Sequence, residues 1–287
     1  MIDITKAKKV FKEYIKNYDP TNGKIAIKIA HMYRVAEIAK NTAKYLRLSD
    51  EDVRLAELIG LLHDIGRFEQ IKQFNTFDDK KSINHGELGI KILFQDNLIR
   101  KFIEDTCYDR IIYLAIINHN KNQSLLTKDV TKRERLHMNI IRDSDTLDIL
   151  NIIIDDNADK KALYDKEDLT DETLSDEIYN EFMKVRELDY GKIKNSADLL
   201  ITRYMFIWNM NYNYALQEIK NRQYLEKLYN KFMYKDQKTM DRITEIYDMT
   251  SRYMNKKLLE ARPNIGRDIY DKFRKMQRGV HKVHQTI

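Results

Sequence analysis

Hydrophobic residues recur along most of this chain at the three- and four-residue spacing of an amphipathic helix. One face of the second predicted helix, for example, carries Ile25, Ile29, Met32, Val35, Ala36 and Ala39. The next helix follows the cap signal Ser49-Asp50-Glu51-Asp52, whose acidic side chains favour the positive end of a helix dipole. In the first half of the chain, the pattern predicts helices over residues 5–18, 24–46, 50–65, 85–95, 98–104, 107–119 and 132–150.

Two polar stretches interrupt this pattern. Residues 67–82 are irregular and predict a loop, whereas the acid-rich segment from Asp155 to Asp176 predicts the seam between two helical subdomains. Beyond the seam, helices are predicted near residues 173–187, 195–220, 222–235 and 237–259. We therefore expect a domain over residues 1–155, a helical extension over 156–263 and a basic tail over 264–287.

The composition agrees with an all-α fold. The chain has two prolines and eight glycines, too few breakers for a many-turned β protein, and its 43% of hydrophobic residues suffice for a core. Cys107 is the only cysteine in the sequence, so no intramolecular disulfide can form and a reducing compartment is favoured. The first residues lack the apolar run of a signal peptide, and the longest apolar stretch, Ile111 to Ile117, is too short to cross a bilayer. We expect a cytoplasmic protein.

The net charge of +6 has a specific location. Residues 256–287 contain nine Lys or Arg and three Asp or Glu, a surplus of six, so the rest of the chain is balanced. A basic tail can bind nucleic acid or anionic lipid, but it can equally be a solvated terminal helix. A dedicated nucleic-acid-binding protein carries a basic face on its folded part, so the charge balance of residues 1–255 argues against that function.

Histidine and aspartate side chains fall where the predicted helices are apolar. His63 and Asp64 end a leucine-rich helix, and His119 ends the apolar run from residue 111. Asp143 and Asp145 follow two isoleucines. Burial of an isolated carboxylate is costly unless a positive charge pairs with it. A divalent cation is such a partner, and imidazole with carboxylate suits iron, manganese, zinc or nickel.

The order of these residues, together with His31 and His85, resembles that of the HD superfamily of metal-dependent phosphohydrolases. The resemblance covers about residues 25–150, and its most specific piece is Leu-Leu-His-Asp-Ile-Gly-Arg at residues 61–67. It implies an HD-domain helical bundle holding two divalent transition metals, iron or manganese in the first place and zinc, nickel or magnesium as alternatives. The implied ligands of the first metal are His31, His63, Asp64 and Asp145, and Asp64 would bridge to a second metal bound by His85 and His119. Asp143 stays open as the alternative to Asp145.

Basic residues near these ligands are candidates for phosphate contacts. Arg67 stands where the family usually has a lysine after its His-Asp pair, and a guanidinium can hold a phosphate in a two-pronged geometry. With Asp64 it would form the catalytic pair. Arg34, one helical turn beyond the first ligand, and Lys121 are further substrate-binding candidates, or else surface charges.

The resemblance implies hydrolysis of a phosphoester or phosphoanhydride bond by a metal-activated hydroxide, as in a phosphomonoesterase, phosphodiesterase or pyrophosphohydrolase. The sequence has no glycine-rich phosphate loop, which argues against a kinase or NTPase. The ligand set is most similar to that of the small dinucleoside-tetraphosphate hydrolases of the superfamily. The expected partner is therefore a small phosphorylated molecule, a nucleotide, and no membrane; an oligomer stays open. The alternative from another class is a catalytically idle module that binds a nucleotide and signals through its C-terminal half.

Overall fold

In the computed structural model of the chain, helices are the only regular elements of the residues described, which are 2–121, 127–155, 170–185, 188 and 190–261. The predicted all-α class is confirmed. The first half consists of α1 (Ile4–Ile15), α2 (Gly23–Tyr45), α3 (Asp50–Leu62), α4 (Gly66–Phe74), α5 (His85–Ile90), η1 (Lys91–Gln95), α6 (Ile99–Phe102), η2 (Thr106–Tyr108), α7 (Asp109–Asn118) and α8 (Lys132–Ile154). The second half consists of α10 (Asp176–Val185), η4 (Tyr190–Lys192), α11 (Ser196–Trp208), α12 (Asn213–Asn221), α13 (Tyr224–Lys231) and α14 (Gln237–Glu260).

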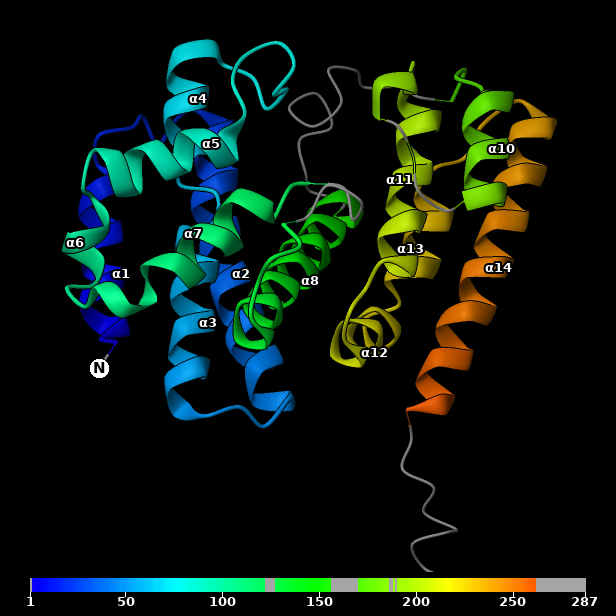
Figure 1. Cartoon of the computed structure of the whole chain (residues 1–287). Coiled ribbons are helices and arrows are strands. Elements are labelled where there is room, and N and C mark those ends of the chain that lie inside the picture. Colours follow the sequence, from blue (N-terminus) through cyan, green and yellow to red (C-terminus); the bar gives the residue numbers. More distant parts are fainter. Residues whose placement is uncertain (1, 122–126, 156–169, 186–187, 189, 262–287) are drawn as a thin grey trace, which may run out of the picture.

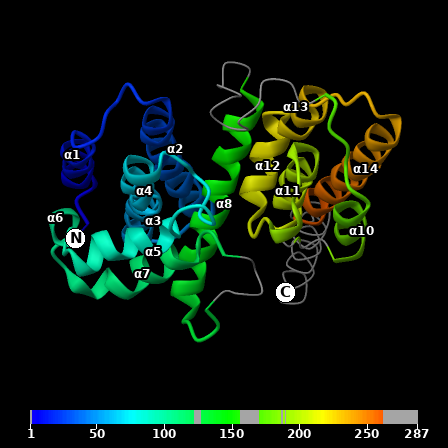
Figure 2. The ribbon, with the colours of Figure 1, turned by 90° about the horizontal axis from the view of Figure 1, so that it is seen from above.

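Helix α8 lies between two groups of helices (Figures 1 and 2). On one side, α1 to α7 enclose a core that reaches α8 at Ile141. On the other side, α10 to α14 form a second core, which includes Leu147 and Leu150 of α8. One helix therefore contributes apolar side chains to both cores and ties the two halves of the molecule together.

Close packing of α2 on α3 brings the rings of two histidines into edge-on contact. A Cβ atom at Gly60 of α3 would lie 2.7 Å from the Cα of Ala36 in α2, a separation that only glycine tolerates. The two helices approach each other here, and the rings of His31 and His63 lie with centroids 5.2 Å apart. The sequence thus places its first two histidines together through a small residue in the helix contact.

A second glycine fixes the start of α5. A Cβ at Gly66 would lie 2.2 Å from the carbonyl oxygen of His85 and 2.6 Å from the backbone nitrogen of Gly89. Asn84 caps α5 by accepting a hydrogen bond from the backbone of Glu87. His85, the first residue of this helix, is consequently held beside the end of α3.

Two predictions of secondary structure are wrong. Residues 67–74 of the predicted loop belong to α4, because Phe68 and Ile71 bury one face of this helix in the core. The single helix predicted over 195–220 is divided into α11 and α12 at residues 209–212. The backbone N–H groups of Asn211 and Tyr212 donate to the carboxylate of Asp143 at 3.0 and 2.8 Å, and this contact stabilises the break.

None of the described helices is long and apolar enough to cross a membrane. The tail predicted over residues 264–287 lies outside the described residues, as does the stretch 156–169 of the predicted extension.

Candidate metal centre

Six of the residues implied as metal ligands come together at one end of the first core. They arrive from five different parts of the chain: the middle of α2, the turn after α3, the start of α5, the residue after α7, and α8. Their ligand atoms form two groups, each with all atoms within 4.8 Å of one another. The first group is His31, His63, Asp64 and Asp145, and the second is Asp64, His85 and His119.

Asp64 belongs to both groups because its two oxygens face opposite ways. Its Oδ2 lies 3.6 Å from Nε2 of His31 and 3.7 Å from Nε2 of His63. Its Oδ1 lies 3.3 Å from Nε2 of His85 and 3.4 Å from Nε2 of His119. A single carboxylate therefore stands between two sets of imidazole nitrogens, which is the arrangement of a bridging ligand.

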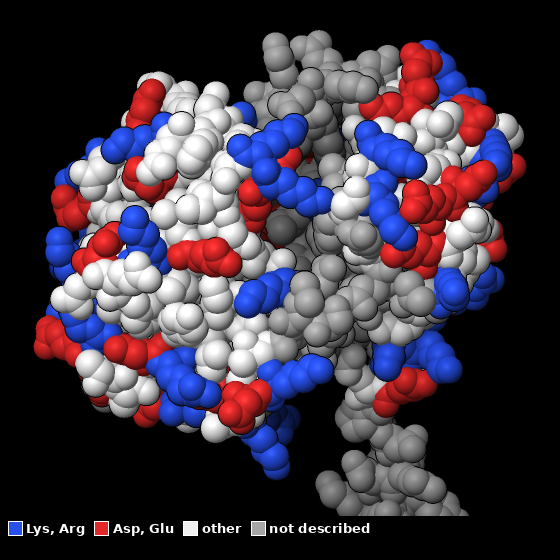
Figure 3. Space-filling model, turned by 45° about the horizontal axis from the view of Figure 1, so that its top comes forward, with Lys and Arg blue, Asp and Glu red and all other residues white. Residues whose placement is uncertain are grey.

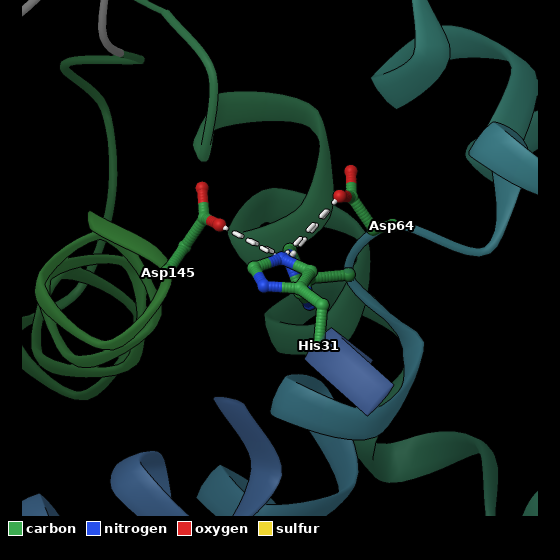
Figure 4. Close-up of side chains that lie close together, drawn as sticks. His31, Asp64 and Asp145 are labelled. Atoms are coloured by element: carbon green, nitrogen blue, oxygen red, sulfur yellow. Dashed lines mark ion pairs between the residues drawn. The ribbon is translucent and has the colours of Figure 1, made fainter. Parts of the chain in front are cut away.

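Asp145 completes the first group. Its Oδ1 lies 3.1 Å from Nε2 of His31 and 3.5 Å from Nε2 of His63. Figure 4 shows the ring of His31 between the carboxylates of Asp64 and Asp145, with an ion pair to each. Asp143 points elsewhere: it accepts the hydrogen bonds from the loop before α12, and burial raises its pKa to about 6.

In each of the four histidines, Nδ1 forms a hydrogen bond with an atom outside the cluster. In His63 and His119, Nδ1 lies 2.8 and 2.6 Å from the carbonyl oxygens three residues earlier. In His31 and His85, Nδ1 lies 2.7 Å from a carboxylate oxygen, of Asp148 and Asp79 respectively. All four partners accept, so each Nδ1 donates its proton, and each Nε2 presents a lone pair to the cluster when its ring is neutral.

This tautomer makes the cluster a fitting site for cations. The Nε2 atoms of His85 and His119 lie 3.0 Å apart, and two lone pairs at that distance repel each other. Nε2 of His63 and Oδ1 of both Asp64 and Asp145 are buried and make no hydrogen bond with any described residue. Buried polar atoms of this kind are costly unless a partner is supplied, and nitrogen with carboxylate oxygen suits divalent transition metals.

The charges around the cluster keep its carboxylates ionised. Burial by itself raises the pKa of Asp64, but the ammonium of Lys28, which is paired with this carboxylate, and the nearby histidines hold it well below its usual range. Burial also raises the pKa of Asp145, but contacts with His31 and His63 again hold it well below the usual range. Both carboxylates are therefore negatively charged and can bind a cation.

The histidines of the two groups differ in basicity. Burial, reinforced by the positive charge of Arg67, lowers the pKa of His85 to about 3. Burial and the charge of Lys28 also lower the pKa of His31, but the carboxylates of Asp145, Asp148 and Asp64 outweigh them and raise it to about 9. Metal binding at neutral pH must consequently displace a proton from the first group, whereas His85 is already neutral.

Three residues of the site carried no role in the sequence analysis. Asp148 orients His31 and also accepts a two-pronged contact from Arg34, at 2.7 and 3.0 Å. The structure therefore does not bring Arg34 to the cavity, where the sequence had suggested a phosphate contact. Asp79 orients His85, and Lys28 pairs with Asp64. Only Lys28 carried a local signal, since it lies one helical turn before His31 on α2.

A cavity of about 1110 Å³ opens over the cluster, and both halves of the molecule line it. Asp64, His85, His119 and Asp145 lie on its floor, while residues 194–210, chiefly of α11, form the opposite wall. Figure 3 shows Lys and Arg side chains on both sides of the hollow. The basic residues among the described lining are Lys24, Lys28, Arg67, Lys80, Lys81, Lys121, Arg142, Lys194 and Arg203.

Residues 29–150 match the family model of the HD domain. The matched segment contains all six residues of the cluster and ends within α8. No curated protein and no solved structure matches the chain.

Proposed function

Because residues 29–150 of this chain are an HD domain, we propose that the protein is a metal-dependent phosphohydrolase that cleaves a phosphoester or phosphoanhydride bond in a small phosphorylated molecule. The observation that carries the proposal is the carboxylate of Asp64. One oxygen faces His31 and His63, and the other faces His85 and His119. This geometry supports two metals with a shared ligand.

The six residues would hold the two metals, with Asp64 between them. Bound there, the metals would supply a water of lowered pKa and neutralise the charge that develops on the phosphoryl oxygens. The protein's own contribution is the orientation of the ligands. His31, His63, His85 and His119 are each fixed through Nδ1, so every ring presents Nε2 without reorganisation.

Arg67 is proposed to bind the phosphate that is cleaved. Its Nη1 is anchored at 2.7 Å to the carbonyl oxygen of Phe77 and at 2.9 Å to Oδ1 of Asp79. Its Nε is buried without a hydrogen bond to any described residue, 3.7 Å from Oδ1 of Asp64. An anchored guanidinium with a spare N–H beside the bridging carboxylate is well suited to a phosphoryl oxygen.

Lys28 and Lys121 add positive charge to the same cavity. Lys28 is paired with Asp64 and would turn to the substrate when the cluster carries its cations. A cavity of about 1110 Å³ is slightly larger than most ligand pockets and far larger than a phosphate group needs. We therefore propose a nucleotide as the substrate, with a dinucleoside-polyphosphate type favoured.

The test is a screen for released phosphate. The full chain, prepared without chelators and loaded with iron(II) or manganese(II), is incubated with nucleoside mono- and polyphosphates, dinucleoside polyphosphates and simple phosphate esters. We expect metal-dependent release that His119→Ala removes. The matched control is His137→Ala, because His137 is a buried histidine outside the cluster, bonded to Asp52 at 2.9 Å.

A protein that binds two metals and binds nucleotides but releases no phosphate would refute the proposal. It would then be the idle nucleotide-binding module.

A further inference from the structure

Arg203 of α11 is a charged group on the wall of the cavity that faces the cluster. Its side chain lines the cavity, and its Nε is buried without a hydrogen bond to any residue that the structure describes. Neither an ion pair nor a hydrogen bond joins its guanidinium to any of the residues described. Its contact is with the ring of Phe206, whose centroid lies 5.1 Å from Cζ.

Lys28 and Arg67, on the other side of the cavity, differ in this respect. Lys28 is paired with Asp64, and Arg67 is paired with Asp79. On the same wall, Lys194 is paired with Glu177 at 3.4 Å. A half-buried guanidinium that lacks such a partner loses hydration without compensation, so an anion bound in the cavity would stabilise it.

The position of Arg203 indicates what kind of anion would bind to it. The cluster and Arg67 belong to the first half of the molecule, and α11 belongs to the second half, across α8 (Figure 1). A single small phosphate bound at the cluster would contact Arg67. A molecule that reaches from the cluster to the wall formed by α11 places a different group beside Arg203.

We propose that Arg203 binds a second phosphate group of the substrate, so that the substrate class is a polyphosphorylated small molecule rather than a simple monophosphate ester. This inference rests on the proposed function. The planar guanidinium suits two phosphate oxygens at once, and the ring of Phe206 holds its plane against the wall. The second half of the chain thereby selects the substrate whose phosphate the first half cleaves.

A binding experiment tests this without turnover. The full chain is stripped of metal with a chelator, and the affinities for adenosine 5′-triphosphate and for phenyl phosphate are measured by calorimetry. Arg203→Met should weaken binding of the triphosphate at least about tenfold and leave phenyl phosphate unchanged. Arg252→Met, an exposed arginine of α14 outside the cavity, is the matched control and should change neither affinity.

Stability separates this role from a structural one. Arg203 has no polar partner to lose among the described residues, so Arg203→Met should melt at the wild-type temperature or above it. Arg203→Lys keeps the positive charge but loses the planar, two-pronged guanidinium. Its affinity for the triphosphate should therefore lie between those of Arg203→Met and the wild type. With metal-loaded protein, the KM for a polyphosphorylated substrate should rise at least about tenfold in Arg203→Met while kcat stays within about twofold.

Wild-type affinity for the triphosphate in Arg203→Met overturns the inference, even if the protein hydrolyses phosphate esters. An equal loss for triphosphate and phenyl phosphate also overturns it, because Arg203 would then act on the cleaved phosphate. Arg203-dependent binding of the triphosphate in a protein without turnover keeps the anion site and rejects the proposed function instead.

Discussion

The Nε2 atoms of His85 and His119 face each other at 3.0 Å, although the Nδ1 atom of each ring already donates to an acceptor. Two nitrogen lone pairs so close together require a cation beside them. Asp64 offers an oxygen to the same point, at 3.3 Å from one ring and 3.4 Å from the other. We therefore propose that this group can hold a metal in its own right, separately from the group at His31 and His63.

The first prediction concerns metal content. Protein purified under reducing conditions without chelators should contain about two transition-metal ions per chain by elemental analysis, iron or manganese first. His119→Ala should retain about one, because His31, His63 and Asp145 remain. His137→Ala should retain both. Absence of metal in the wild-type protein would contradict the site, and one metal per chain would demote His85 and His119 to substrate contacts.

The second prediction concerns the shared carboxylate. Asp64→Ala should abolish hydrolysis, because both metal sites lose a ligand. In the metal-free protein, the same change leaves Lys28, whose side chain is 13% exposed, without its partner, and the free energy of unfolding should fall by about 1–3 kcal/mol. Steady-state kinetics and denaturant unfolding measure the two effects. A variant with near-wild-type turnover would show that the cluster is not the catalyst.

Much of the helical frame follows from local sequence, because apolar spacing and capping residues act within a few turns. Most of the expected helices of the first half therefore exist, and the His-Asp pair stands at the end of a buried helix as its leucines imply. The convergence of the six residues followed from resemblance to a family. The spacing of these residues along the chain does not by itself predict that they meet.

The contacts of the residues around the ligands could not be predicted from the sequence, because their partners are distant along the chain. Asp148 bonds to His31 across 117 positions, and Asp143 bonds to Asn211 across 68. Arg203 lies in a stretch that reads as an ordinary apolar helix, and only the fold brings it to the cavity. Helix α4 was missed for a similar reason: its two buried hydrophobic side chains, Phe68 and Ile71, are too few to make a pattern without the core they pack against.

The third prediction concerns acid stability. Asp52, near the start of α3, accepts hydrogen bonds from His137 and Arg133 of α8 at 2.9 and 2.8 Å. Burial raises the pKa of Asp52, but these contacts outweigh it and lower the pKa below its usual value. A depressed folded-state pKa stabilises the fold above the unfolded-state pKa of about 4, and this stability is lost as the pH falls through the folded-state pKa.

Asp52→Asn should therefore lower the free energy of unfolding by about 1–2 kcal/mol at pH 7, with a smaller loss below pH of about 4. Urea unfolding of metal-free wild-type and variant proteins at several pH values gives the difference directly. The same penalty at every pH would contradict an ionic role for Asp52.

The fourth prediction separates the site from the basic tail. Deleting residues 264–287 should leave turnover of small substrates intact, because the described residues that line the cavity lie between Lys24 and Met210. Any affinity of the full chain for nucleic acid should fall with the deletion and weaken with added salt, since it would depend on screened surface charge. Loss of turnover in a truncated protein that folds and keeps its metals would place the tail in the functional unit.

The last prediction concerns Asp143, which joins α8 to the loop between α11 and α12. The residue is 2% exposed, and its carboxylate accepts from the backbone of Asn211 at 3.0 Å, from the side chain of Asn211 at 2.8 Å and from the backbone of Tyr212 at 2.8 Å. Asp143→Ala leaves all these donors unpaired, so the free energy of unfolding should fall by about 2–4 kcal/mol.

Asp143→Asn distinguishes this bond from mere packing. Its amide oxygen can still accept from Asn211, but its NH2 group would face the N–H of Tyr212, so we expect a loss between wild type and Asp143→Ala. The loop at 209–212 also carries Asn209 and Met210 into the cavity wall. Loosening it should raise the KM for a polyphosphorylated substrate in both variants, in the same order as their stabilities, while metal content stays at the wild-type value. Unchanged stability in Asp143→Ala would mean that the loop is held by its other contacts, and an altered metal content would return Asp143 to the ligand set in place of Asp145.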